Sequence, residues 1–460
     1  MKLSIMKKIN NKRTFLTVAL FIFLLFVIKP YSFSKKCNLK NFSAKHEGDV
    51  VTQSGVGIEA NKNELLSAYK QTEPELAPIE ELGKRLFFDT NLSTPPGQSC
   101  AACHSSEVGW TGPDEAINKS GSVYEGALKG RFGNRKPPSS AYAGDSPVLG
   151  IDQEGNFVGG MFWDGRATGE ASGDALTEQA MGPFLNPLEQ NNADIKSIIK
   201  KIQKSDYVLL FEEVWGPGSL DYKKNIDLTY ERIARSIAAY ERSAEVNQFS
   251  SRFDDFWRKA GSKSLYVEKI DESNWQNYKN LGLSNVELKG LMLFNKKGMC
   301  ANCHVLTSED DQPPLFTDFT YDNLGIPKNP ENPFYSMPKE WNPEGKEWLD
   351  KGLGGYLEKI EKYAKYAAEN YGKHKVPTLR NVDSRLHEGF VKAYMHNGFF
   401  KSLQDIVHFY NTRDKADEKW PKPEITVNVN KTELGNLGLT PVEEEAIVAF
   451  MKTLSDRKKP

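Results

Sequence analysis

The chain contains CAACH at residues 100–104 and CANCH at residues 300–304, and this repeated pattern decides the class of protein. In a C-x-x-C-H motif, one helical turn brings two thiols to one side, where they can bond the two vinyl groups of a haem. The adjoining histidine can then bind the iron as its proximal ligand. The residues expected to hold two haems are Cys100, Cys103, His104, Cys300, Cys303 and His304.

Two other uses of paired cysteines fit these motifs less well. A zinc site or a thioredoxin-like redox pair also uses C-x-x-C, but neither requires the histidine that follows in both copies. The chain has only 5 Cys and 7 His, so two such motifs do not arise by chance. The sequence therefore predicts a di-haem c-type cytochrome, with iron bound at His104 and His304.

The N-terminus has the pattern of a secretory signal peptide over residues 1–34. Six Lys or Arg and no acid occur there, and an apolar run of 14 residues, Phe15 to Ile28, precedes the small-x-small pattern Ser32-Phe33-Ser34. The run is shorter than the roughly 20 residues that span a bilayer. We expect cleavage, a periplasmic protein and no membrane contact afterwards, with an uncleaved anchor as the alternative. Export agrees with the haem motifs, because haem is attached to such proteins outside the cytoplasm.

The composition excludes several other classes. Without residues 1–34 the chain carries 54 Lys and Arg against 61 Asp and Glu, a formal charge of -7, which gives a nucleic-acid partner no support. Five cysteines do not make a disulfide scaffold, and the one outside the motifs, Cys37, has no assigned role. With 39% hydrophobic residues, the chain can bury a sizeable core.

Apolar spacing predicts a mainly α fold of two tandem cytochrome c-like haem domains with long connecting loops. Each haem motif follows an apolar run, Leu82 to Phe88 in the first half and Leu288 to Phe294 in the second. The expected division is a signal peptide at 1–34, an N-terminal haem domain at 35–257, a polar linker or insertion at 258–283 and a C-terminal haem domain at 284–460.

Single elements can also be predicted. Capping boxes at Ser284 to Glu287 and at Thr440 to Glu443 mark two helix starts. Periodicity predicts further helices over 228–245 and 355–372, and the Gly- and Pro-rich stretch 105–165 predicts loops.

Further segments carry a resemblance to a known family. They are LGKRLFFD at 82–89, FWDGRA at 162–167, VPTLRN at 376–381 and YMHNG at 394–398. With the haem motifs, they make the sequence similar to the bacterial di-haem cytochrome c peroxidase family, which includes the MauG-like enzymes. The resemblance runs from about Leu82 to Leu454.

The resemblance implies roles for particular residues. The first haem is the peroxidatic one in this family and the second transfers electrons, so catalysis is expected at the His104 haem. Gln179 and Glu189 match the family's residues above the peroxide-binding iron, and a positioned carboxylate is what moving a proton between peroxide oxygens requires. Trp163 matches the tryptophan between the two haems and is the candidate bridge, with a plain core tryptophan as the alternative.

The sequence departs from the family pattern at three positions. In several family members a histidine closes the resting peroxide site, and the corresponding residue here is Ser120. No His occurs between His104 and His304. The first iron is therefore expected to be open unless Met161 or Met181 binds it. The usual distal Met of the second haem corresponds to Tyr410, as in MauG-like members, with Met395 and His408 as rivals. Lys136 stands where the calcium site has an Asn, which argues against bound calcium.

The sequence is compatible with two catalytic functions and one non-catalytic function. A cytochrome c peroxidase reduces hydrogen peroxide with electrons from a small cytochrome c or cupredoxin. A MauG-like enzyme uses peroxide-derived high-valent haem to oxidise Trp or Tyr side chains of a partner protein, a reading that Tyr410 and the missing histidine favour. A plain electron carrier is the third, against which Gln179 and Glu189 argue. The sequence leaves a homodimer open.

The two haem motifs make a direct prediction about the mature protein. Intact mass measured after denaturation and acid-acetone extraction is expected to retain two haems, because thioether bonds survive both treatments. A mass that retains one haem or none contradicts the prediction.

Overall fold

The structure is a computed structural model, and it describes residues 75–308 and 311–457. The predicted signal peptide and Cys37 lie outside the described residues. Helices dominate and the strands are few and short, so the prediction of a mainly α protein is confirmed. Over the described ranges, we find no helix with the length and apolar character needed to cross a bilayer.

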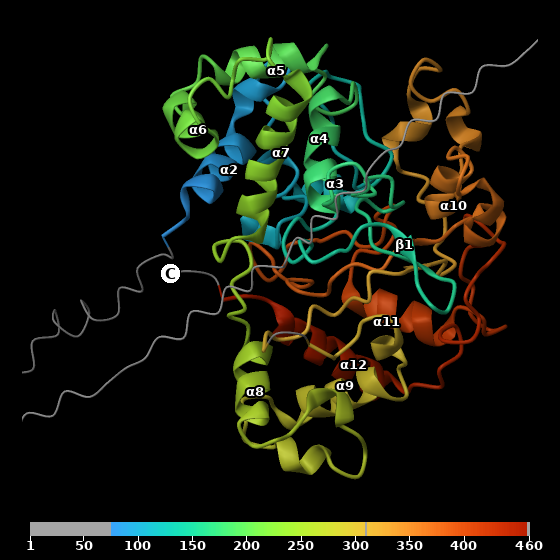
Figure 1. The fold of residues 1–460 in the computed structure, drawn as a ribbon. Coiled ribbons are helices and arrows are strands. Elements are labelled where there is room, and N and C mark those ends of the chain that lie inside the picture. Colours follow the sequence, from blue (N-terminus) through green and yellow to red (C-terminus); the bar gives the residue numbers. More distant parts are fainter. Residues whose placement is uncertain (1–74, 309–310, 458–460) are drawn as a thin grey trace, which may run out of the picture. The chain divides into compact units, whose positions relative to one another are not determined.

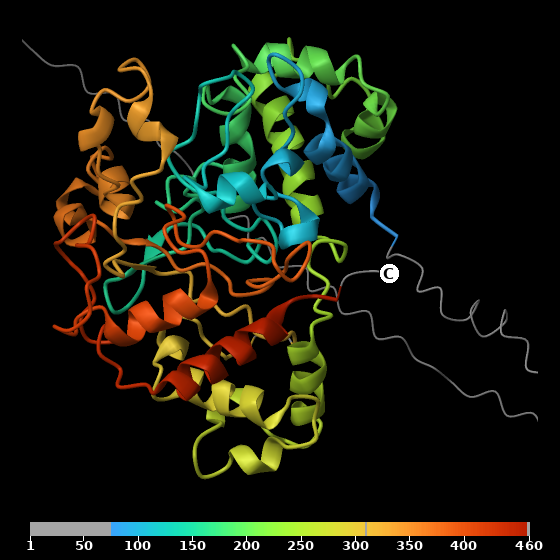
Figure 2. The ribbon, with the colours of Figure 1, turned by 180° about the vertical axis from the view of Figure 1, so that it is seen from behind.

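The helices fall into two groups that pack around separate cores (Figure 1), and the reverse view shows the same grouping (Figure 2). The first group contains α2 (Pro78–Phe88), α4 (Ala175–Leu185), α5 (Ile195–Ile202), α6 (Val208–Trp215) and α7 (Ile226–Arg242). The second contains α8 (Arg252–Gly261), α9 (Asn285–Asn295), α11 (Leu403–Thr412) and α12 (Pro441–Met451). Two short helices, α3 (Glu115–Lys119) and α10 (Gly352–Leu357), lie in the long connecting segments.

Each group is built on one close helix pair, α2 with α7 in the first and α9 with α12 in the second. A glycine lies at each crossing. A Cβ on Gly83 would lie 1.9 Å from the carbonyl oxygen of Ser236, and a Cβ on Gly290 would lie 1.9 Å from that of Ala446. The two pairs therefore use the same device to bring two backbones together.

Helix starts follow the local sequence. Ser284 and Thr440 cap α9 and α12, and each is paired with a glutamate three residues later, as the capping boxes predict. The helix predicted over 228–245 is α7. The stretch 355–372 is not one helix as predicted, because it consists of the end of α10 and two 3-10 turns.

The segment 258–283 does not stand apart as the expected polar linker. Val267, Ile270 and Tyr278 are buried in the core of the second helix group, together with residues of α9. Charged residues separate these apolar positions in the sequence, so the average polarity of the segment conceals its contribution to the core.

The remaining chain is mostly loop, with two small ladders. Strand β1 (Gly150–Ile151) is antiparallel to β2 (Phe157–Val158), with Gly150 opposite Val158. Strand β3 (Tyr321–Asp322) is antiparallel to β4 (His374–Lys375), with Tyr321 opposite Lys375. The Tyr321 hydroxyl donates to the Gly159 carbonyl at 2.6 Å, so the second ladder lies against the first half of the chain.

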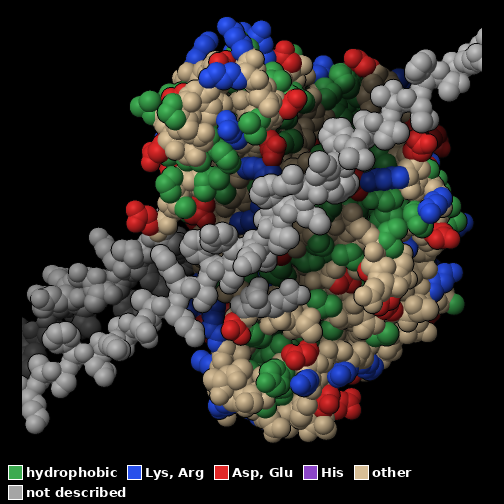
Figure 3. All heavy atoms as spheres, in the orientation of Figure 1, with side chains coloured by type: hydrophobic (Ala, Val, Ile, Leu, Met, Phe, Trp, Pro, Cys, Tyr) green, Lys and Arg blue, Asp and Glu red, His purple; other side chains and the backbone are tan. Residues whose placement is uncertain are grey.

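The surface carries charged groups of both signs (Figure 3). Lys196, Lys200 and Lys204 are exposed on and after α5, at the end of the molecule where Figure 3 shows basic side chains together. The opposite face of α5 buries Ile198, Ile199 and Ile202. This pattern is that of an ordinary amphipathic surface helix.

The two crossing glycines lead to a stability prediction. Gly83→Ala and Gly290→Ala are each expected to lower the free energy of unfolding by about 1–3 kcal/mol or more, because the added methyl meets backbone that cannot move without separating the helices. Urea denaturation of the haem-loaded protein measures the effect.

Gly261→Ala is the control for this prediction. A Cβ at Gly261, the last residue of α8, meets nothing within 4 Å, so the substitution should be neutral or slightly stabilising. Equal destabilisation by all three substitutions would contradict the close-packing explanation.

Candidate functional site

Both haem motifs form the same tight turn. The backbone is a short 3-10 turn at Cys100–Ala102 and again at Cys300–Asn302. The amide of His104 donates to the Cys100 carbonyl at 3.1 Å, and the amide of His304 donates to the Cys300 carbonyl at 2.8 Å. Each turn thus brings two sulfurs and one imidazole to one wall of a cavity.

The imidazoles are oriented by backbone carbonyls. Nδ1 of His104 lies 3.2 Å from the carbonyl oxygen of Trp110, and Nδ1 of His304 lies 2.8 Å from that of Phe316. A carbonyl can only accept a hydrogen bond, so each Nδ1 carries the proton and each Nε2 has a free lone pair. Burial lowers the pKa of His104 to about 4, so its ring is neutral at pH 7. A neutral imidazole held by its other nitrogen is what an iron ligand requires, and both sites therefore fit a c-type haem.

The first cavity has a volume of about 160 Å³ and is lined by Cys100, Cys103 and His104. Gln179, from α4, and Glu189, from the turn that follows α4, line the same cavity, although neither adjoins the haem motif in sequence. These are the two residues that the sequence selects for the peroxide site.

Glu189 is a half-buried acid in the wall of the first cavity. Burial raises its pKa, while the guanidinium of Arg166, which also lines the cavity, acts in the opposite direction. The Ala127 amide donates to the Glu189 carbonyl at 2.7 Å, and the Glu189 amide donates to the Asn186 carbonyl at 3.0 Å, so the backbone at this position is fixed. A carboxyl with a raised pKa can hold a proton at a pH where an ordinary exposed carboxyl cannot.

The residues that could bind the first iron as a sixth ligand differ in whether they line the first cavity. Ser120 is exposed and does not line the cavity, and Met181 packs in the first helix core instead. Met161 does line the cavity, so it is the one alternative ligand raised by the sequence that has access to it.

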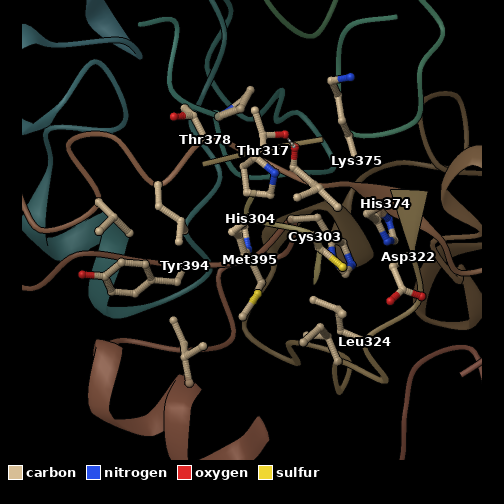
Figure 4. A pocket seen from close by; sticks show the side chains of 18 of the residues that line it. Cys303, His304, Thr317, Asp322, Leu324, His374, Lys375, Thr378, Tyr394 and Met395 are labelled. Carbon is tan, nitrogen blue, oxygen red and sulfur yellow. Dashed lines mark hydrogen bonds between the residues drawn. The ribbon is translucent and has the colours of Figure 1, made fainter. Parts of the chain in front are cut away.

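The second cavity has a volume of about 270 Å³ and contains Cys300, Cys303 and His304 in its wall. Figure 4 looks into it, with Met395 among the labelled side chains around the space next to His304 and Cys303. Tyr410, from α11, also lines this cavity. Burial, followed by the neighbouring Cys300 and Cys303, raises the pKa of Tyr410. His408, the third candidate ligand, is not in the cavity wall and its Nδ1 lies 3.1 Å from Glu444.

Trp163 lines both cavities. Its indole N–H donates to the Lys136 carbonyl at 2.8 Å, and its own carbonyl accepts from the Lys375 amide at 2.9 Å. Its ring meets the ring of His396 edge to face, with centroids 6.4 Å apart. The side chain is therefore fixed at the boundary between the two sites.

The turn that carries Trp163 recurs in the second half. Phe162 and Met395 both have a positive φ, 65° and 67°, and a glycine with positive φ follows three residues later in each case. The two turns are closed by equivalent bridges, Met161 to Ala167 and Tyr394 to Phe400. Trp163 and His396 thus occupy corresponding positions of a repeated turn and contact each other.

Comparison with known proteins agrees with this arrangement. A family model described as di-haem cytochrome c peroxidase matches residues 77–262. Methylamine utilization protein MauG of Paracoccus denitrificans is 30% identical over 403 residues, 85% of this chain and 91% of that protein. This chain belongs to the di-haem cytochrome c peroxidase family.

Two further relatives cover most of the chain. Cytochrome-c peroxidase IdrP2 of Denitromonas iodatirespirans is 25% identical over 407 residues, 87% of this chain and 88% of that protein. The crystal structure of the diheme peroxidase BthA from Burkholderia thailandensis has a TM-score of 0.64 and 28% identity, and covers 83% of this chain and 87% of that one. As a family member, the protein is an enzyme, a di-haem peroxidase or MauG-like oxidoreductase, with two c-type haems.

His374 is a feature of this family member that the sequence analysis did not select. Its side chain is 10% exposed and stacks on His396, with centroids 3.6 Å apart and ring planes 8° apart. Asp350 lies 3.3 Å from His374 Nε2, so the three side chains together resemble a metal site. The lone pairs of two parallel stacked rings lie in parallel planes, so they do not converge on one cation. Arg135 also binds Asp350 already, at 2.6 Å. Both features oppose a cation chelated by these three side chains.

Lys136, which stands where the resemblance implies a calcium-ligating Asn, is buried. Its ammonium donates to the Thr111 hydroxyl and to the Pro137 carbonyl, both at 2.8 Å. A protein cation thus occupies oxygen ligands of the kind that calcium prefers. That calcium is not bound stays a prediction.

Proposed function

We propose that the protein reduces hydrogen peroxide in the His104 cavity, with electrons that arrive from the His304 cavity, and that it works in the periplasm. The observation that carries this proposal is the meeting of Gln179 and Glu189 with His104 in one cavity, while Trp163 lines that cavity and the next one. An electron carrier without catalysis needs no acid with a raised pKa in its haem cavity.

The chemistry divides between the cofactor and the chain. A c-type haem bound at Cys100, Cys103 and His104 would supply an iron that binds and reduces peroxide. The chain must take a proton from the near oxygen of peroxide and deliver one to the far oxygen, which leaves as water. Glu189 is suited to this transfer because burial raises its pKa. The amide of Gln179 can donate and accept hydrogen bonds, and can therefore orient peroxide beside Glu189.

In this proposal the His304 site supplies electrons to the His104 site. Trp163 is the side chain at the boundary of the two cavities, and its contact with His396 extends the aromatic path toward the second. Its fixed indole N–H and carbonyl hold the ring in one orientation. We infer that Trp163 mediates electron transfer between the sites.

The tandem-domain architecture belongs to the same proposal. Two helix pairs with glycine crossings, two similar motif turns and two copies of the Trp163 turn support the pair of cytochrome c-like domains that the sequence predicts at 35–257 and 284–460. Helix α8 and the segment 258–283 would then both belong to the second domain, since their buried residues lie in that core, which moves the boundary from 257 to the start of α8.

A second candidate differs in what is oxidised. Tyr410 lines the second cavity, and an anionic phenolate ligand stabilises ferric iron and lowers its reduction potential. Such a site suits a MauG-like enzyme that oxidises Trp or Tyr side chains of a partner protein. A cytochrome c peroxidase instead takes electrons from a small cytochrome c or cupredoxin. Turnover with a reduced cytochrome separates the two candidates from each other.

Tyr410 is the subject of one prediction. If its phenolate ligates the second iron, Tyr410→Phe should remove the low-spin ferric spectrum of that haem and raise its reduction potential, because the neutral ring cannot bind iron. Absorption spectra and redox titration of the oxidised protein measure both effects.

Met395→Leu is the matched variant, since Met395 lines the same cavity. It should leave the spectrum and the potential unchanged. The reverse result, a changed Met395→Leu and an unchanged Tyr410→Phe, would assign the ligand to Met395.

Glu189 is the subject of a second prediction. Glu189→Gln keeps the side-chain volume but removes the proton-carrying group, so the reaction of the oxidised protein with peroxide should slow by roughly a hundred-fold or more. Binding of cyanide should change less, because the cavity stays open. Stopped-flow absorption after mixing with peroxide measures the rate.

Glu107→Gln serves as the control for this experiment. Glu107 is exposed in the turn after the first haem motif and does not line the cavity, so its loss should leave the rate unchanged. Equal rates for wild type and Glu189→Gln would show that another group moves the proton.

A further inference from the structure

Two buried lysines lie at the boundary between the halves of the chain. Lys136 comes from the loop after α3 and lines both cavities, while Lys392 comes from the loop before α11 and lines the second. Their residues are 8% and 4% exposed. An ammonium this deeply buried is unfavourable unless an anion compensates its charge.

Neither ammonium has a carboxylate partner among the described residues. Lys136 donates to Thr111 and Pro137, and Lys392 donates to the carbonyls of Val108, at 2.8 Å, and Asn381, at 3.0 Å. These acceptors are neutral oxygens. An ammonium has three N–H donors, so each lysine keeps one donor for a further acceptor.

The surrounding charges increase the need for an anion. Burial, followed by the ammonium of Lys401, lowers the pKa of Lys136 to about 7. Burial and then Lys136 itself hold the pKa of Lys392 well below its usual range. The negative charge of Asp383 raises the pKa of Lys392, but this carboxylate is already paired with Arg385 at 2.8 Å.

Haem brings anions of the right kind to these cavities. Each haem carries two propionate carboxylates on the edge opposite the vinyl groups that bond the cysteines, so two covalently held haems introduce four carboxylates. We propose that Lys136 and Lys392 bind haem propionates, Lys392 in the second cavity and Lys136 at the boundary of the two. This inference rests on the two c-type haems of the family and not on the proposed peroxide chemistry.

The proposal has a measurable electrostatic consequence. A positive charge beside a haem favours the reduced iron, so removal of an ammonium lowers the reduction potential. Lys392→Met should lower the midpoint potential of the His304 haem, and Lys136→Met should lower that of at least one haem. Lys392→Arg keeps the charge and should retain most of the wild-type potential. Redox titration of the holoenzyme, followed by absorption, gives these values without any peroxide reaction.

Lys201→Met is the matched control. Lys201 is also partly buried, but its ammonium has protein acceptors for every donor, including Ser93, Thr94 and Asn192, and it lines neither cavity. Its substitution should leave both potentials unchanged. Potentials of Lys136→Met and Lys392→Met that match those of Lys201→Met would overturn the proposal.

A measurement on the wild type covers the case in which a variant does not fold. A crystal structure of the haem-loaded protein is expected to show a propionate oxygen within hydrogen-bond distance of Nζ of Lys136 and of Lys392. A free anion at either ammonium, with the propionates elsewhere, would overturn the proposal for that lysine. An ammonium that contacts no anion would do the same.

Discussion

The hydrogen bond from an imidazole Nδ1 to a backbone carbonyl is the interaction on which both sites depend. It fixes the rings of His104 and His304 and keeps the proton on Nδ1, so Nε2 is the nitrogen left to bind iron. The carbonyls belong to Trp110 and Phe316, residues well outside the C-x-x-C-H motifs, so each site is completed only when the following loop folds back. The packed helix pairs beneath the motifs hold these loops in position.

The two cavities share a boundary that is rigid and unusually charged. A repeated turn brings Trp163 and His396 into contact. In each copy of the turn the residue before the ring has a positive φ. Around it lie cations from both halves, namely the buried Lys136 and Lys392 and the largely buried Arg135 that pairs with Asp350. Lys136 lines both cavities, so its charge can act on both haems, whereas Lys392 lines only the second cavity and Arg135 only the first.

The sequence predicts the parts of this account that are local. The haem motifs, the capping boxes of α9 and α12 and helix α7 follow from neighbouring residues, and their physical causes lie within a few turns of chain. Gln179 and Glu189 follow only from the resemblance to the family, because periodicity marks neither. His374 could not be found, because its stacking partner His396 is brought to it by loop packing that no spacing rule describes. The same limit applies to the segment 258–283, whose few apolar residues become part of a core only once α9 lies beside them.

If the first iron is open and the second is closed by a protein ligand, as we propose, the oxidised enzyme can react with peroxide without prior activation. Electron paramagnetic resonance of the resting oxidised protein tests this most directly, with and without cyanide. The account predicts one high-spin ferric haem that becomes low-spin on addition of cyanide, together with one low-spin haem that does not respond. Two low-spin haems, both indifferent to cyanide, would contradict it.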